Sequence, residues 1–199
     1  MPEMIRILCE GLATILFTLI CTRFLCKNMK KRDFRFVPWL PYVLTGCGSA
    51  MLLLLDGLSP RTFCGIAFLF VLLYASVQDH STHEADDILS VMMLMMAVTN
   101  ISEATVLSQL LGAAIVGGAQ MLIALCGKKR MGIGGADIKL STAAALLLGF
   151  YKGVIGFMLG LLIAVVAQLI ITHRKKEQRT QPFALLPYLS VGFIIGYLI

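Results

Sequence analysis

The fold class of this chain follows from residues 153–173, which read GVIGFMLGLLIAVVAQLIITH and contain no Asp, Glu, Lys or Arg. A helix crosses the hydrocarbon layer of a membrane with about 20 mostly apolar residues, and this stretch has that length. The rest of the chain has the same character, since 58% of its 199 residues are hydrophobic, only 14% are charged and the mean hydropathy is +0.87. A soluble domain averages about 45–50% apolar and about 25% charged residues. The composition therefore predicts an integral membrane protein with little room for a soluble domain.

Other apolar runs surround this stretch at regular intervals. The candidate spans are residues 4–26, 37–56, 61–78, 87–101, 104–126, 135–151, 153–173 and 183–199. We expect an all-α polytopic membrane helix bundle of about eight transmembrane helices, forming a single integral-membrane domain over residues 1–199. Two small-xxx-small pairs, Gly156 with Gly160 and Gly192 with Gly196, predict close approach of the last helices.

The basic residues predict an orientation. One set of alternate connections carries Lys27, Lys30, Lys31, Arg32, Arg35, Lys128, Lys129, Arg130, Arg174, Lys175, Lys176 and Arg179, and the opposite set carries Arg6, Arg61 and Lys152. Cytoplasmic loops of membrane proteins are enriched in Lys and Arg. We therefore expect a multi-pass protein of the cell membrane with the loops near 27–36, 79–86, 127–134 and 174–182 in the cytoplasm and both termini outside. Because the basic clusters separate apolar runs, the net charge of +6 indicates such loops and no nucleic-acid partner.

Two aspartates fall on this predicted cytoplasmic side. Asp79 ends the third span and opens the polar stretch QDHSTHEADD (78–87), whereas Asp137 follows GIGGA (132–136) and opens the sixth span. Two carboxyls brought together share one proton and titrate as a pair. The ionised one can take a proton from an attacking water while the protonated one donates to a peptide carbonyl. The pattern predicts aspartic-protease chemistry with Asp79 and Asp137 as catalytic residues and no metal or cofactor.

The neighbours of the aspartates suggest supporting roles. Gly134 and Gly135 give the backbone freedom to turn and to approach a substrate strand, although an ordinary flexible turn before a helix explains them equally well. If a helix starts near Asp137, its dipole favours the ionised carboxylate there, while Asp79, at a helix C-terminus, holds a proton more readily. Lys139 would point away from Asp137, and we expect it to extend toward the lipid headgroups.

The segment GGADIKL (134–140) resembles the type IV prepilin peptidases, intramembrane aspartic proteases marked by a G-x-G-D motif. The resemblance identifies Asp137, followed by Ile-Lys-Leu, as the second catalytic aspartate, with Ala136 in place of the second motif glycine. It identifies Asp79 as the first catalytic aspartate and Asp87 as the trailing acid of a D-x6-P-[DN] pattern, in which Ala85 and Asp86 replace the usual Ile-Pro. Residues 181–193, QPFALLPYLSVGF, are similar to the C-terminal segment of that family, so the likeness covers about residues 60–199.

The resemblance implies an endopeptidase that removes the basic leader of a prepilin or pseudopilin at the cytoplasmic face of the lipid bilayer. Such a substrate joins a basic leader to an apolar helix. Glu84, Asp86 and Asp87 would either attract that leader or form a solvated loop face. The connection KNMKKRDFRF (27–36) lacks the larger cysteine-bearing domain associated with N-methylation, so we expect no methyltransferase activity.

Other functions are open to the same residues. Carboxylates in polytopic proteins often serve proton-coupled transport, and polar residues inside the spans, Glu10, Gln109, Gln120 and Gln168, would line such a path. A catalytically silent scaffold is a third reading. A metal site at Asp79, His80, His83 and Glu84 is disfavoured because HSTHE does not have the H-E-x-x-H spacing of helical zinc proteases. The six cysteines form no C-x-x-C pair and indicate neither a zinc site nor a disulfide framework.

Overall fold

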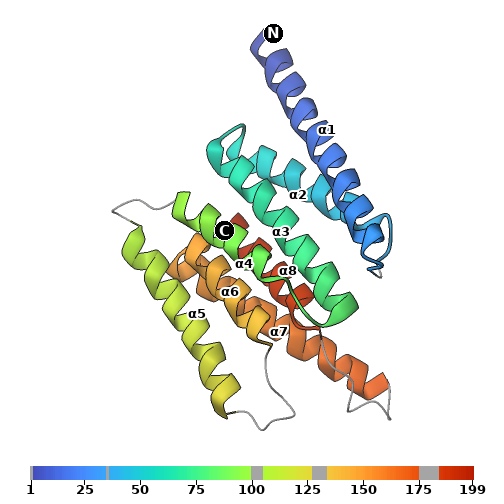
Figure 1. Ribbon diagram of the computed structural model, residues 1–199. Coiled ribbons are helices and arrows are strands. Elements are labelled where there is room, and N and C mark those ends of the chain that lie inside the picture. Colours follow the sequence, from blue (N-terminus) through green and yellow to red (C-terminus); the bar gives the residue numbers. More distant parts are fainter. Residues whose placement is uncertain (1, 35, 100–104, 127–133, 175–183) are drawn as a thin grey trace.

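The computed structural model describes residues 2–34, 36–99, 105–126, 134–174 and 184–199, and within these ranges the chain forms helices and no strand (Figure 1). The helices are α1 (Pro2–Lys31), α2 (Leu40–Asp56), α3 (Pro60–Thr82), α4 (Asp87–Thr99), α5 (Val106–Cys126), α6 (Gly135–Leu148), α7 (Phe150–Arg174) and α8 (Leu186–Leu198). Each lies on one of the ranges expected from the sequence, which confirms the all-α helical bundle.

The bundle has the surface of a membrane protein. Four helices, α1, α3, α5 and α7, contain segments that are long and apolar enough to cross a bilayer, and α2, α4 and α8 are shorter apolar helices. Large apolar side chains point away from the bundle on many helices; Leu54, for example, is 87% exposed and Leu125 72%. Soluble proteins rarely expose apolar surface on this scale. The outward faces therefore fit contact with lipid.

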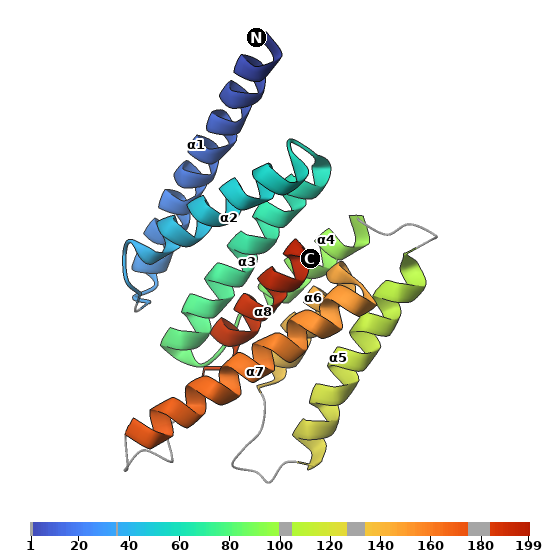
Figure 2. The same cartoon turned by 180° about the vertical axis from the view of Figure 1, so that it is seen from behind.

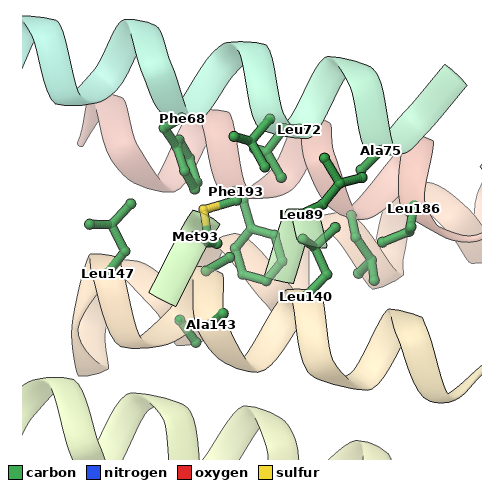
Figure 3. Packing of buried hydrophobic residues seen from close by; sticks show 14 of the residues in the cluster. Phe68, Leu72, Ala75, Leu89, Met93, Leu140, Ala143, Leu147, Leu186 and Phe193 are labelled. Carbon is green, nitrogen blue, oxygen red and sulfur yellow. The ribbon is translucent and has the colours of Figure 1, made fainter. Parts of the chain in front are cut away.

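The core lies where α3, α4, α6 and α8 meet (Figure 3). Its buried side chains include Phe68, Leu72 and Ala75 from α3, Leu89 and Met93 from α4, Leu140, Ala143 and Leu147 from α6, and Leu186 and Phe193 from α8. Helix α5 covers the far side of α6, and α7 covers α8. The two helices that carry the predicted aspartates, α3 and α6, are therefore held by one shared core.

The contact between α7 and α8 is the most extensive helix pair in the bundle. A Cβ atom on Gly192 would overlap the backbone of Gly156 and Gly160, and one on Gly160 would lie 2.8 Å from the Cα atom of Leu189. Only residues without a side chain allow two helix backbones to approach so closely. The close packing predicted from the two glycine pairs is confirmed.

Helices α1 and α2 form a separate edge beside α3, and the N-terminal half of α1 stands away from the other helices (Figures 1 and 2). Buried hydroxyls join the two helices: the Oγ1 atoms of Thr22 and Thr45 are 2.7 Å apart, and Thr18 Oγ1 is 3.3 Å from Ser49 Oγ. Hydrogen bonds of this kind between helices contribute about 0.6–2 kcal/mol each inside a membrane.

Candidate active site

Asp79 lies in the last turn of α3 and is only 5% exposed. The helix continues three residues beyond it to Thr82, because the hydroxyls of Ser81 and Thr82 bond back to the carbonyls one turn earlier and His83 ends the helix in a left-handed conformation. The N–H of His83 donates to the Asp79 carbonyl at 2.9 Å. The prediction of a loop over residues 79–86 is therefore wrong for residues 79–82. The loop was expected to start where the hydropathy falls, at Gln78, but the helix ends only at its C-cap residue, His83.

The carboxylate of Asp79 contacts the start of α8. Its Oδ2 atom accepts the backbone N–H of Leu186 at 2.9 Å, and the N–H of Leu185 also bonds to it. Pro187 occupies one of the first positions of α8, as is common at helix starts. Asp79 thus sits at the C-terminus of one helix and the N-terminus of another. The bias toward a protonated Asp79 that was expected from α3 alone is opposed by these N–H groups, which stabilise the ionised form.

Asp137 lies in the first turn of α6, which begins directly after Gly134. The side chain folds back over Gly134, since a Cβ atom placed there would be 3.3 Å from Asp137 Oδ2. The N–H of Gly134 bonds to the Asp137 carboxylate, and the Gly134 carbonyl accepts the N–H of Asp137 at 3.1 Å. No atom lies within 4 Å of a Cβ built on Gly135. Of the two glycines, Gly134 is the one that makes room for the carboxylate.

The structure brings the two predicted aspartates to the same end of the bundle. The charge of Asp79 acts on the Asp137 carboxyl; Asp79 is buried and Asp137 is partly buried. Two carboxyls that interact in this way hinder each other's ionisation and can titrate as a pair. The pair can therefore supply one base and one acid at the same time.

Lys139 forms an ion pair with Asp87, with 2.8 Å between Nζ and Oδ1. Asp87 is the first residue of α4, so the pair ties the start of α6 to the start of α4. The sequence did not indicate this ion pair, and the expectation that Lys139 extends toward the lipid headgroups stays a prediction. Both side chains are exposed, and such pairs contribute about 0–1 kcal/mol.

The loop that follows α3 is also tied to α1. Arg32 Nη1 donates to Asp86 Oδ2 at 2.6 Å, and this hydrogen bond from the guanidinium holds the pKa of Asp86 below its ordinary value. Two of the three loop acids considered for leader binding, Asp86 and Asp87, are therefore already paired with the chain's own cations. Glu84 is exposed on the same loop and forms no ion pair within the described part of the chain.

Two residues that the sequence did not single out as site residues support the turn that carries Asp137. Ser141 Oγ lies 2.6 Å from the Asp137 carbonyl and 2.8 Å from Oε1 of Gln120 on α5. Gln120 is 1% exposed, and its Nε2 atom has no hydrogen-bond partner among the described residues. In the sequence, Gln120 is visible only as a lone glutamine in an apolar span. Gln120 does not line one transport path with the other span glutamines, because Gln109 lies toward the other end of α5 and Gln168 is exposed on α7.

Histidines flank the site without forming a metal centre among the residues described. The charges of His80 and His83 act on Asp79, but both side chains are exposed. No group of three or more His, Cys, Asp or Glu side chains gathers as metal ligands would in the described ranges. Several residues used for the sequence predictions lie outside the described residues or side chains: Arg6, Glu10, Arg35, 128–130, Arg174, 175–179 and 181–183.

A comparison with protein families matches residues 66–173 to the type IV leader peptidase family. This range includes Asp79, Asp87, Asp137 and Lys139, and it covers more than half of the chain. Comparisons with curated proteins and with solved structures give no significant match.

Proposed function

The chain belongs to the type IV leader peptidase family, and on that basis we propose that it is an aspartic endopeptidase whose Asp79 and Asp137 cut the basic leader from prepilin-like substrates. The observation that carries the proposal is the convergence of the two carboxyls, from opposite ends of two different helices, within electrostatic reach of each other. A scaffold or a transporter would not need this pairing.

The reaction uses the shared proton of the pair. The ionised aspartate accepts a proton from a water molecule, whose oxygen attacks the carbonyl carbon of the scissile peptide bond. The protonated aspartate donates to the carbonyl oxygen, which gives a neutral gem-diol intermediate. Its collapse breaks the C–N bond: the protonated carboxyl gives its proton to the amine nitrogen, and one gem-diol hydroxyl gives its proton to the ionised carboxyl, which restores one proton to the pair as the carboxylic acid and the amine leave.

The position of the pair suits a substrate that joins a basic leader to an apolar helix. Both aspartates lie at helix ends, next to polar loops, so the substrate helix can remain in lipid while the junction reaches the carboxyls. The orientation from the basic residues makes this the cytoplasmic face. Exposed Glu84 remains available to attract the leader, whereas Asp86 and Asp87 would first have to leave Arg32 and Lys139. Only the peptidase step is proposed, since residues 27–36 are too short for a cysteine-bearing methylation domain.

The test is cleavage of a panel of prepilins and pseudopilins in membranes, read by the intact mass of the substrate. Wild type should cut at the leader–helix junction, and Asp79→Asn and Asp137→Asn should each abolish cutting, because an amide cannot exchange the required proton. Asp33→Asn is the matched control: Asp33 is exposed with φ 57°, a conformation that Asn adopts readily, so this variant should cut normally. Cutting by either active-site variant at a rate near wild type would show that the assignment is wrong.

A further inference from the structure

A second polar region lies at the other end of the bundle. A cavity of about 340 Å³ opens there among α3, α5, α7 and α8. Its lining includes Arg61, Ser108, Gln109, Leu148, Lys152 and Tyr197. Sites for small ligands typically enclose about 300–1,000 Å³ and combine apolar walls with a few polar groups. We call this cavity the distal pocket.

The distal pocket lies about one membrane thickness away from the aspartates. Arg61 and Asp79 lie near opposite ends of α3, and the 18 residue steps from one to the other span about 27 Å at 1.5 Å per residue. The hydrocarbon core of a bilayer is about 30 Å thick. When Asp79 lies at one boundary of the hydrocarbon layer, the distal pocket therefore lies at the opposite boundary, level with the lipid headgroups.

The pocket carries a net positive charge. Arg61 and Lys152 both line it, and their like charges act unfavourably on each other. Arg61 has one partner, Asp56, at 3.5 Å, while Lys152 forms no ion pair within the described ranges, although Asp56 is near enough to act on it electrostatically. The described lining includes no Asp or Glu. Among the described residues, one carboxylate therefore faces two cations, which leaves one positive charge in excess.

Arg61 and the backbone of Lys152 are held in place before any ligand arrives. The guanidinium of Arg61 lies over the ring of Tyr197, 5.9 Å from its centroid, and the Tyr197 hydroxyl donates to the Arg61 carbonyl at 2.6 Å. Lys152 follows Gly149, the residue at which α6 ends and α7 begins, and its carbonyl packs against Gly196 of α8. Side chains that are already ordered lose less entropy on binding.

Helix ends of both polarities surround the pocket. The lining includes Thr105 and Gly149, which directly precede α5 and α7, and Leu148 and Tyr197, which lie at the C-terminal ends of α6 and α8. The partial positive charges of the two N-termini are opposed by the partial negative charges of the two C-termini, so the positive charge of the pocket comes from Arg61 and Lys152. Because Gly149 has φ 80° and a Cβ there would lie 3.1 Å from Ser108 Oγ, the chain can pass between the two helices at this point without filling the space.

We propose that the distal pocket binds a phosphate group, and specifically the headgroup phosphate of an anionic phospholipid. A phosphate would sit between Arg61 and Lys152, relieve their repulsion and supply the missing counterion. The apolar walls at Cys64, Leu147 and Leu148 would face the glycerol and the first part of the acyl chains. This binding is independent of the peptidase reaction, so neither proposal depends on the other.

The test measures lipid retention on the purified full chain by native mass spectrometry, with dioleoylphosphatidylglycerol compared with dioleoylphosphatidylcholine. We expect wild type to retain the anionic lipid at least about tenfold more strongly, and Lys152→Gln and Arg61→Gln to lose that preference. Lys152→Arg should keep it, as should Arg23→Gln, which removes an exposed cation from α1. Circular dichroism checks that each variant is folded, and the two Gln variants report on the pocket independently of each other.

A second arm distinguishes the two sources of phosphate. Thermal unfolding is followed while inorganic phosphate is added to lipid-depleted protein. Stabilisation of wild type but not of Lys152→Gln, without any lipid preference, would keep the phosphate site and assign free phosphate as its ligand. A lipid preference that survives in the Arg61→Gln/Lys152→Gln double variant would overturn the proposal. The absence of both a lipid preference and a phosphate effect would overturn it as well.

Discussion

Replacement of Gly134 by alanine should lower peptidase activity without unfolding the protein. The new Cβ would lie 3.3 Å from Asp137 Oδ2, which is tighter than nine in ten real Cβ contacts, so the carboxyl must shift by a few tenths of an ångström. A misplacement of 1 Å at a reacting group costs about a hundredfold in rate. The smaller shift should therefore reduce kcat about three- to tenfold. Loss of glycine as the N-cap of α6 should cost about 0.5–1 kcal/mol of stability.

Gly135→Ala is the matched control, one residue further along. A Cβ at Gly135 meets nothing within 4 Å, and alanine is favoured over glycine inside a helix by up to about 1 kcal/mol. This variant should keep kcat and gain stability. Both variants are assayed for leader cleavage at saturating substrate, with thermal unfolding in detergent as the stability measurement. If Gly135→Ala loses as much activity as Gly134→Ala, the glycines serve the approach of the substrate backbone, and room for the Asp137 carboxyl does not explain Gly134.

Three further outcomes follow from contacts around the site. Asp79→Ala should be less stable to thermal or denaturant unfolding than Asp79→Asn by about 1–2 kcal/mol. The reason is that Asn still accepts the N–H of Leu186, whereas Ala leaves the start of α8 uncapped. Equal stability of the two variants would show that this hydrogen bond does not hold α8. Arg32 lowers the pKa of Asp86 in the folded state below its ordinary 3.8, so the ion pair should persist above pH 3.8 and be lost as the pH falls through the lower, folded-state pKa. Spin labels on α1 and on the loop after α3 should therefore move apart only in that acid range. Separation of the labels near pH 6 would contradict the assignment. Gly192→Ala should destabilise the bundle by about 1–3 kcal/mol, since its Cβ would overlap the backbone of α7; an unchanged unfolding midpoint would mean that the two helices are not in this contact.

The positions of the helices along the chain, and their closest contact, were predictable because they depend on local patterns in the sequence. Runs of apolar residues placed all the helices, and the spacing of Gly156, Gly160, Gly192 and Gly196 predicted the closest helix pair. The residues at which helices end were harder to predict, since helix ends depend on capping residues. The end of α3 required His83 to adopt a left-handed conformation, which no hydropathy pattern indicates.

The partners of the site residues could not be read from the chain, because they come from distant segments. Lys139 meets Asp87 across 52 positions of sequence, and Arg32 meets Asp86 across 54. The sequence placed all of these near the same membrane face, but it could not tell which charges would pair. Periodicity and topology assign a residue to a face; the packing of the core then decides which side chain it touches.

The placement of Asp79 finally depends on α8, a helix that lies beyond the residues matched to the peptidase family. The N–H of Leu186 reaches Asp79 Oδ2 because α8 packs against α3, where Ser76 and Ser190 are hydrogen-bonded, and against α7, where the glycines at 156, 160 and 192 allow close approach. A side chain at Gly192 must push α8 away from α7 or slide it along its axis, and either movement lengthens the bond to Asp79. Gly192→Ala should therefore lower peptidase activity at temperatures where the protein remains folded, although Gly192 touches neither aspartate. Full activity in a folded but destabilised Gly192→Ala variant would show that the position of Asp79 does not depend on the contact between α7 and α8.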